Sequence, residues 1–181
     1  MNIFVTGRPG VGKTSVVQRT MQALAELGYE AGGAYCPEIR VGATRVGFEV
    51  IDLKTGRKGI LAHVNQPDGP RVGRYTVNLH DLSEVGAGAI IRAMEETDYI
   101  VIDEVGPMEL HSRSFREAVT RAVEGPKPVL GILHHRLQDP LINRIKGRKD
   151  AMVYEVTPQN RESLHNIIAK LIAKEAERLK A

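Results

Sequence analysis

The segment GRPGVGKT, residues 7–14, places the strongest constraint on how this chain can fold. It follows the pattern G-x-x-x-x-G-K-[ST], in which glycines let the backbone curl until successive N–H groups point into one small concavity. Such a concavity binds phosphate, with the lysine reaching the terminal phosphates of a nucleotide and the hydroxyl binding Mg²⁺. The predicted nucleotide contacts here are Gly7, Arg8, Pro9, Gly10, Val11, Gly12, Lys13 and Thr14, with Lys13 also catalytic and Thr14 also a Mg²⁺ ligand.

The flanking segments match the setting that a phosphate loop requires, a buried strand before it and a helix after it. Residues 2–6, NIFVT, form a short apolar run that predicts a strand. The segment SVVQRTMQALAELG then places Val17, Met21 and Leu24 on one helical face before a terminal glycine. These flanks disfavour the alternative of a glycine-rich turn with an incidental lysine.

Length and charge restrict the class of protein. With 181 residues the chain can bury one core but is too short for two ordinary domains, so we expect one domain, residues 1–181. The 25 basic and 22 acidic residues are spread along the chain, and aromatic residues make up only 4%. We therefore expect no dedicated nucleic-acid site.

The single cysteine and the apolar stretches bear on location. Because Cys36 is the only cysteine, no internal disulfide can form. Without a C-x-x-C spacing, Cys36 is interpreted as a small buried or half-buried residue. No stretch reaches the roughly 18 apolar residues of a membrane span, and the chain opens with a strand pattern instead of a signal peptide. We expect a cytoplasmic protein that makes no membrane contact.

Strand and helix patterns alternate at both ends of the chain, which predicts an α/β fold: a three-layer sandwich with a mostly parallel sheet and helices on both faces. The middle differs, because about residues 46–64 contain two strand patterns around a KTGRK turn, an inserted antiparallel hairpin. Further strands are predicted over 74–79, 98–106, 127–135 and 151–156, and helices over 82–97, 112–125 and, as a short helix or lid, 137–148.

A C-terminal helix is predicted to open at Thr157 and Pro158, as N-cap and first-turn residues. Its apolar stripe is interpreted as a contact with the core. The stripe consists of Leu164, Ile167, Ile168, Leu171 and Ile172.

A second motif, YIVIDEVGPMEL, supplies the acids that a phosphate site needs. A buried parallel strand delivers its carboxyl end to the crevice where α/β sheets bind ligands. Asp103 is therefore expected to orient Mg²⁺ through water, and Glu104, pointing the opposite way along the strand, to align an attacking water. Two solvated acids at a strand end are the alternative, which the phosphate loop in the same chain makes weaker.

Several cationic and polar residues are further candidates for contacts with the phosphates or the base. Charge on a transferring phosphoryl group calls for an arginine, and the candidates are Arg8, Arg136 and Arg144, although the pattern at each of them alone is more typical of a surface residue. After the strand pattern over 127–135, one of His134 and His135 could sense the γ-phosphate. Asn160 and Arg161 could lie near the nucleobase or simply be first-turn polar residues.

Taken together, these segments resemble the thermostable or cancer-related nucleoside-triphosphatases, a branch of the P-loop NTPases with a RecA-like core. The resemblance covers nearly the whole chain and rests on TGRPGVGKTS, RVGFEVIDL, VGRYTVNL, IVIDEVGPMEL, KPVLG and NRIKGRKDAMVYEVTPQNRESL. It implies a P-loop NTPase domain and slow, Mg²⁺-dependent hydrolysis of ATP, GTP, CTP and UTP with weak base discrimination. A site that binds mainly the phosphates gains little affinity from the base and therefore discriminates weakly among bases. The sequence also lacks the N-K-x-D motif of a dedicated GTPase.

The resemblance also implies particular residues. It makes Glu109 a family feature whose role the sequence does not reveal, and Pro107 stands where many relatives carry lysine. The second implied set of nucleotide contacts is Ile100, Val101, Ile102, Asp103, Glu104, Val105, Gly106 and Pro107. Two other functions stay open: a P-loop nucleotide or nucleoside kinase, and a binding module switched by nucleotide.

Overall fold

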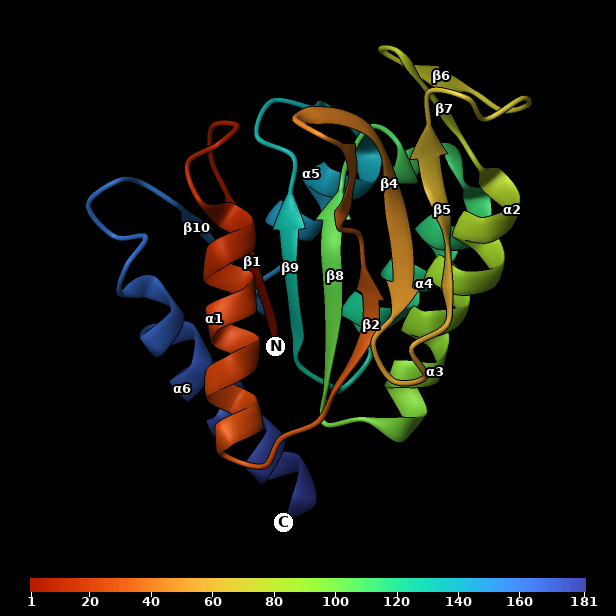
Figure 1. Cartoon of the computed structure of the whole chain (residues 1–181). Coiled ribbons are helices and arrows are strands. Elements are labelled where there is room, and N and C mark those ends of the chain that lie inside the picture. The colour runs from red at the N-terminus through yellow and green to blue at the C-terminus, as the bar shows by residue number, and fades with distance from the viewer.

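The computed structural model describes residues 1–181 and contains one ten-stranded sheet (Figure 1). The strands are β1 (Asn2–Thr6), β2 (Ala31–Tyr35), β3 (Glu38–Val41), β4 (Thr44–Asp52), β5 (Lys58–His63), β6 (Arg71–Val72), β7 (Tyr75–Val77), β8 (Tyr99–Val105), β9 (Val129–Leu133) and β10 (Ala151–Glu155). Their order is β10-β1-β9-β8-β2-β4-β5-β7-β6, with β3 paired to β4. Pairing is parallel from β10 to β2 and antiparallel from β4 onward, which confirms the predicted mostly parallel α/β sheet with its inserted hairpin.

Helices cover both faces of the parallel half. They are α1 (Lys13–Glu26), α2 (Leu79–Asp81), a π-helical turn η1 (Leu82–Ala87), α3 (Gly88–Glu96), a 3₁₀ turn η2 (Glu109–His111), α4 (Arg113–Glu124), α5 (Pro140–Lys146) and α6 (Leu164–Lys180). Figure 1 shows α1 and α6 together on one side of the sheet and α3, α4 and α5 on the other. No helix is long and apolar enough to cross a membrane.

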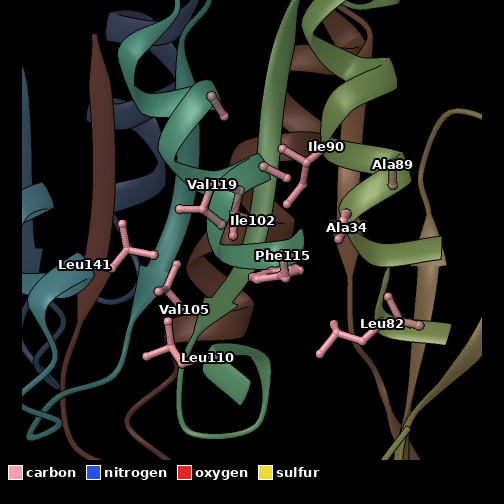
Figure 2. Close-up of a cluster of buried hydrophobic side chains, with 14 of the residues drawn as sticks. Ala34, Leu82, Ala89, Ile90, Ile102, Val105, Leu110, Phe115, Val119 and Leu141 are labelled. Carbon is pink, nitrogen blue, oxygen red and sulfur yellow. The ribbon is translucent and has the colours of Figure 1, made fainter. Parts of the chain in front are cut away.

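The alternation of side chains along the central strand β8 explains the two cores. Tyr99 and Val101 belong to the cluster under α1 and α6, whereas Ile100 and Ile102 belong to the larger cluster under α3, α4 and α5. In Figure 2, Ile102 lies beside Phe115 of α4. Because all four side chains are buried, β8 is held from both faces and its carboxyl end is fixed in space.

Strand β2, AGGAY, is one element that no sequence pattern predicted, because it lacks the apolar alternation typical of strands. Its glycines have a packing role instead. A Cβ on Gly33, whose φ is +108°, would lie 2.1 Å from the carbonyl oxygen of Val101, and a Cβ on Gly32 would lie 2.7 Å from Ala93. Glycine therefore lets β2 pack closely against β8 and α3.

The C-terminal helix begins later than predicted. Residues 157–163 form turns, and α6 starts at Leu164, so the assignment of Thr157 and Pro158 to its N-terminus is wrong. Asn160 stabilises the turns instead: its Oδ1 accepts a hydrogen bond from the Thr157 N–H at 2.8 Å, and its Nδ2 donates to Glu155 O at 2.9 Å. A side chain that satisfies the backbone in this way competes with helix formation.

The apolar stripe of α6 is only partly a core contact. Leu164, Ile168 and Ile172 are buried, and Leu171 packs against them. Ile167, in contrast, is 52% exposed, so its assignment to the core is wrong. Ile167 lies beside the buried stripe, on the part of the helix surface that faces solvent.

The segment predicted as a short helix or lid is a short helix packed into the core. The buried side chains of α5 are Leu141, Ile142 and Ile145, which belong to the larger cluster. Asp139 caps its N-terminus by accepting a hydrogen bond from the Leu141 N–H at 2.8 Å, and also pairs with Arg116 of α4.

Candidate functional site

The loop between β1 and α1 has the backbone conformation that a phosphate cradle requires. Gly7, Gly10 and Gly12 have φ values of +147°, +76° and +113°, a region that side-chain-bearing residues rarely adopt. At Gly7 a Cβ would also approach the carbonyl oxygen of Val156 to 3.0 Å. Helix α1 begins immediately after Gly12, so its free N–H groups and positive dipole end face the same place.

Lys13 closes this loop. Its Nζ donates hydrogen bonds to the carbonyl oxygens of Gly7 at 2.9 Å and Arg8 at 3.0 Å. Burial lowers the pKa of the Lys13 ammonium, while the nearby Glu104 carboxylate raises it. The side chain therefore lies between the phosphate loop and the acids of β8.

A β-bulge explains how two neighbouring acids reach one cavity. Ile102 of β8 pairs with Gly131 of β9, but the next pair is Val105 with Leu133, so Asp103 and Glu104 oppose a single residue. In a regular strand the two side chains would point to opposite faces. Both side chains line the same cavity here.

Asp103 has the surroundings expected of a carboxylate that holds a metal. Its Oδ2 accepts a hydrogen bond from the Cys36 N–H at 2.8 Å, which fixes the side chain and leaves Oδ1 without a protein partner. Burial, and then the charge of Glu104, raise the pKa of Asp103 to about 7, although the bond from Cys36 lowers it. Asp103 and Thr14 line one cavity, and an unpartnered carboxylate oxygen with a hydroxyl fits Mg²⁺, which keeps several waters when it binds protein.

Glu104 lies among charges of both signs. Burial raises the pKa of its carboxyl group, while His134 and Lys13 lower it. His134 is oriented by the loop that follows β9, because its Nδ1 accepts a hydrogen bond from the Leu137 N–H at 3.1 Å. This leaves its Nε2 as the ring nitrogen that carries the proton.

Glu109, on η2, is a further acid that lines the cavity. Its side chain is buried, and burial followed by the charges of Glu104 and Asp103 raises the pKa of its carboxyl group well above the ordinary value. The same acids and burial raise the pKa of the half-buried Cys36 thiol, which agrees with the interpretation of Cys36 as a structural residue. The sequence signals for Glu109 were its place in the otherwise apolar MEL segment and the family resemblance, neither of which revealed its role.

The cavity has a volume of about 1160 Å³ and collects many of the predicted residues at the carboxyl ends of the parallel strands. Those that line it are Gly7, Arg8, Pro9, Lys13, Thr14, Asp103, Glu104, Pro107, His134, His135 and Arg136. Sequence reasoning missed its second wall, which includes Glu38, Arg45, Phe48, Leu61, Val72 and Met108. The second wall comes mainly from the hairpin region, whose role no motif announces.

Other candidates lie elsewhere. The side chains of Ile100, Val101, Ile102 and Val105 are buried in the two cores and do not line the cavity. Arg144 forms an ion pair with Glu124 at the far end of α4.

The turn at residues 157–163 lies on the other side of the phosphate loop. The Arg161 Cδ would be 3.6 Å from a Cβ on Gly12, so this side chain packs over the loop. Neither Arg161 nor Asn160 lines the cavity.

Comparisons with known proteins agree with this geometry. The sequence model of a family described as NTPase matches residues 2–169. The chain is 47% identical to the nucleoside-triphosphatase THEP1 of Thermofilum pendens over 175 residues, 95% of each chain. It is 48% identical to the protein of the same name from Methanosarcina acetivorans over 165 residues, 91% of this chain and 92% of that protein.

Two solved structures share the fold. The crystal structure of THEP1 from Aquifex aeolicus superposes with a TM-score of 0.84 at 32% identity, covering 95% of this chain and 99% of that one. The solution structure of a human cancer-related nucleoside triphosphatase gives a TM-score of 0.78 at 32% identity, covering 94% and 96%. By its phosphate loop, its paired acids and these likenesses, the chain belongs to the NTPase family of P-loop proteins that includes these nucleoside-triphosphatases.

Proposed function

We propose that this protein, as one domain of residues 1–181, hydrolyses the β–γ bond of ATP, GTP, CTP and UTP in a Mg²⁺-dependent reaction with low base selectivity. The observation that carries the proposal is that the phosphate loop and the acids Asp103 and Glu104 line one cavity. The names of the relatives, nucleoside-triphosphatases, support the same reaction class.

The phosphate loop binds the triphosphate. Backbone N–H groups and the N-terminus of α1 would donate to its oxygens. Lys13 Nζ now donates to the carbonyl oxygens of Gly7 and Arg8, and would exchange these bonds for charge-assisted bonds to the β- and γ-phosphates. Mg²⁺, held by Thr14 and through water by Asp103, would neutralise charge that develops on the phosphates.

Glu104 positions the attacking water. Its carboxylate would accept a hydrogen bond from that water and orient its oxygen toward the γ-phosphorus, while the β-phosphate leaves on the opposite side. Burial raises the Glu104 pKa, and His134 and Lys13 act against it by favouring the carboxylate form that accepts this bond. His134 also lines the cavity, where its Nε2–H would be available to donate to a γ-phosphate oxygen.

The transition-state cation is expected to be Arg8 or Arg136, because both line the cavity. Arg144 is a poor candidate, since its guanidinium pairs with Glu124. The kinase alternative also loses its main sequence support, because the proposed arginine-rich lid is the packed helix α5.

Low base selectivity is expected because most of the binding affinity comes from contacts with the phosphates. Backbone N–H groups, Lys13 and Mg²⁺ all bind phosphate oxygens, which every nucleoside triphosphate presents alike. Near the loop, the Arg161 side chain packs over Gly12, and a guanidinium can stack on any base.

Phosphate release from ATP, GTP, CTP and UTP, with Mg²⁺ and with EDTA, tests the proposal. We expect comparable rates for all four substrates in Mg²⁺ and no release in EDTA. Release from one substrate alone would contradict the low selectivity, and equal rates in EDTA would contradict the role of the metal. Absence of release despite nucleotide binding would favour a phosphate acceptor other than water or a nucleotide switch.

A further inference from the structure

The cavity is larger than one nucleotide site requires. Its volume of about 1160 Å³ exceeds the roughly 300–1000 Å³ of pockets that bury a single small ligand. The phosphate loop and the acids of β8 occupy one end. The other end, the hairpin half of the cavity, is bounded by Phe48, Leu61, Val72, Met108 and Glu109.

The order of strands indicates that the nucleoside of the bound triphosphate lies away from the hairpin half. The phosphate loop follows β1, which pairs with β10 on one side and β9 on the other. The γ-phosphate belongs with Asp103 and Glu104 on β8, on the β9 side. The α-phosphate and the nucleoside therefore extend toward β10, where the Arg161 side chain packs beside Gly12.

The hairpin half has a preformed apolar wall. Phe48 of β4 contacts Tyr75 edge to face, with ring centroids 5.4 Å apart. The Arg45 guanidinium lies over the Phe48 ring at 5.0 Å and pairs with Glu38 at 3.0 Å. Fixed in this way, the wall presents a surface suited to a flat ring and loses little conformational freedom when a ligand binds.

Glu109 lacks a side-chain partner within this wall. It is only 5% exposed, and the nearby backbone N–H groups of Gly106 and of Glu109 itself lower the pKa that burial raises. Asp103 accepts a hydrogen bond from the Cys36 N–H, and His134 and Lys13 lower the pKa of Glu104, but no side chain donates to Glu109. A buried carboxyl group that faces a cavity in this way is suited to accept hydrogen bonds from a ligand.

We propose that the hairpin half of the cavity binds a nucleoside as a second ligand, next to the γ-phosphate of the bound triphosphate. Its base packs against Phe48, Leu61 and Val72, and its hydroxyl groups donate to Glu109. A planar ring with several hydroxyl donors matches both parts of the wall. The inference rests on the proposed function in one respect, namely that a triphosphate occupies the phosphate loop.

Calorimetric titration tests this site directly. Adenosine, guanosine, cytidine and uridine are titrated into protein saturated with Mg²⁺ and a non-hydrolysable ATP analogue, which blocks the phosphate loop and the primary nucleoside position. We expect at least one of them to bind. Val72→Phe, which fills the hairpin half, should weaken that binding about tenfold or more, whereas Arg71→Phe, an exposed neighbour on β6 that does not line the cavity, should not.

Glu109→Leu provides a second variant that does not depend on filling space. It removes the hydrogen-bond acceptors at similar volume and replaces a buried polar group with an apolar one, so the fold should remain stable. Nucleoside binding should again fall about tenfold. Both variants should bind the ATP analogue as tightly as the wild type does.

Three results would overturn the inference: no nucleoside binds, the variants bind as the wild type does, or the ATP analogue competes with the nucleoside. Competition would mean that the nucleoside had occupied the primary site. Failure of the proposed function is seen separately, since it appears as failure of the ATP analogue itself to bind. A nucleoside affinity lost in Val72→Phe would still support the second site in that case.

Discussion

Asp139 makes two contacts that stabilise α5, a helix cap and an ion pair with Arg116. Its Oδ1 accepts the Leu141 N–H at 2.8 Å and caps α5, while its carboxylate accepts two hydrogen bonds from Arg116, at 3.1 and 2.6 Å. Loss of an N-cap costs about 1 kcal/mol. The ion pair is partly exposed, with 36% of the Arg116 side chain and 13% of the Asp139 side chain accessible, so we assign it about 0.5–1 kcal/mol.

Two substitutions separate these contributions. Asparagine caps a helix as well as aspartate does, so Asp139→Asn should remove only the ion pair and lower the free energy of unfolding by about 0.5–1 kcal/mol. Asp139→Ala removes both and should cost about 1.5–2 kcal/mol. Urea unfolding, followed by circular dichroism at pH 7, measures both values.

The pH dependence gives an independent check. The Arg116 guanidinium holds the pKa of Asp139 below its ordinary value, so the pair stabilises the fold fully above the unfolded pKa and loses this effect as the pH falls through the folded one. The difference between wild type and Asp139→Asn should therefore be constant above about pH 5 and shrink below about pH 4. Equal losses in the two variants, or a difference that acid leaves unchanged, would refute this reasoning.

Two further predictions concern packing and the transition-state cation. Gly33→Ala brings a Cβ to 2.1 Å from Val101 O and should lower the free energy of unfolding in urea by about 3 kcal/mol or more. The control Gly56→Ala has a φ of +75° but open space around the Cβ, so it should cost about 1–2 kcal/mol. Equal costs would contradict the close contact of β2 with β8. Arg136→Ala should lower kcat about tenfold or more because Arg136 lines the cavity, whereas Arg144→Ala should leave kcat unchanged. An unchanged kcat in Arg136→Ala would leave Arg8 as the cation.

The parts of the site that depend on local backbone conformation and on the order of elements could be predicted from the sequence. The phosphate loop could be predicted because its glycines and Lys13 serve a local backbone conformation, and the order of strand and motif placed the β8 acids at the same edge of the sheet. The inserted hairpin could be predicted as well, because alternation and a turn signal are local features.

Features that depend on tertiary contacts could not be predicted. Strand β2 relies on Gly33 meeting β8, and the bulge that brings Asp103 and Glu104 to one cavity depends on the register against β9. The delayed start of α6 depends on side-chain bonds made by Asn160. Glu109 gave only a weak signal, because its importance arises from burial beside other acids.

The central claim is that Lys13 binds the triphosphate and Glu104 acts on water. The most direct test compares Lys13→Ala, Glu104→Gln and the control Glu49→Gln, a β4 residue that does not line the cavity, for Mg²⁺–ATP affinity and single-turnover phosphate release. We expect Lys13→Ala to lose affinity, Glu104→Gln to keep affinity but lose most of its turnover, and the control to match the wild type. Equal loss of affinity in the first two variants, or full turnover in Glu104→Gln, would contradict the account.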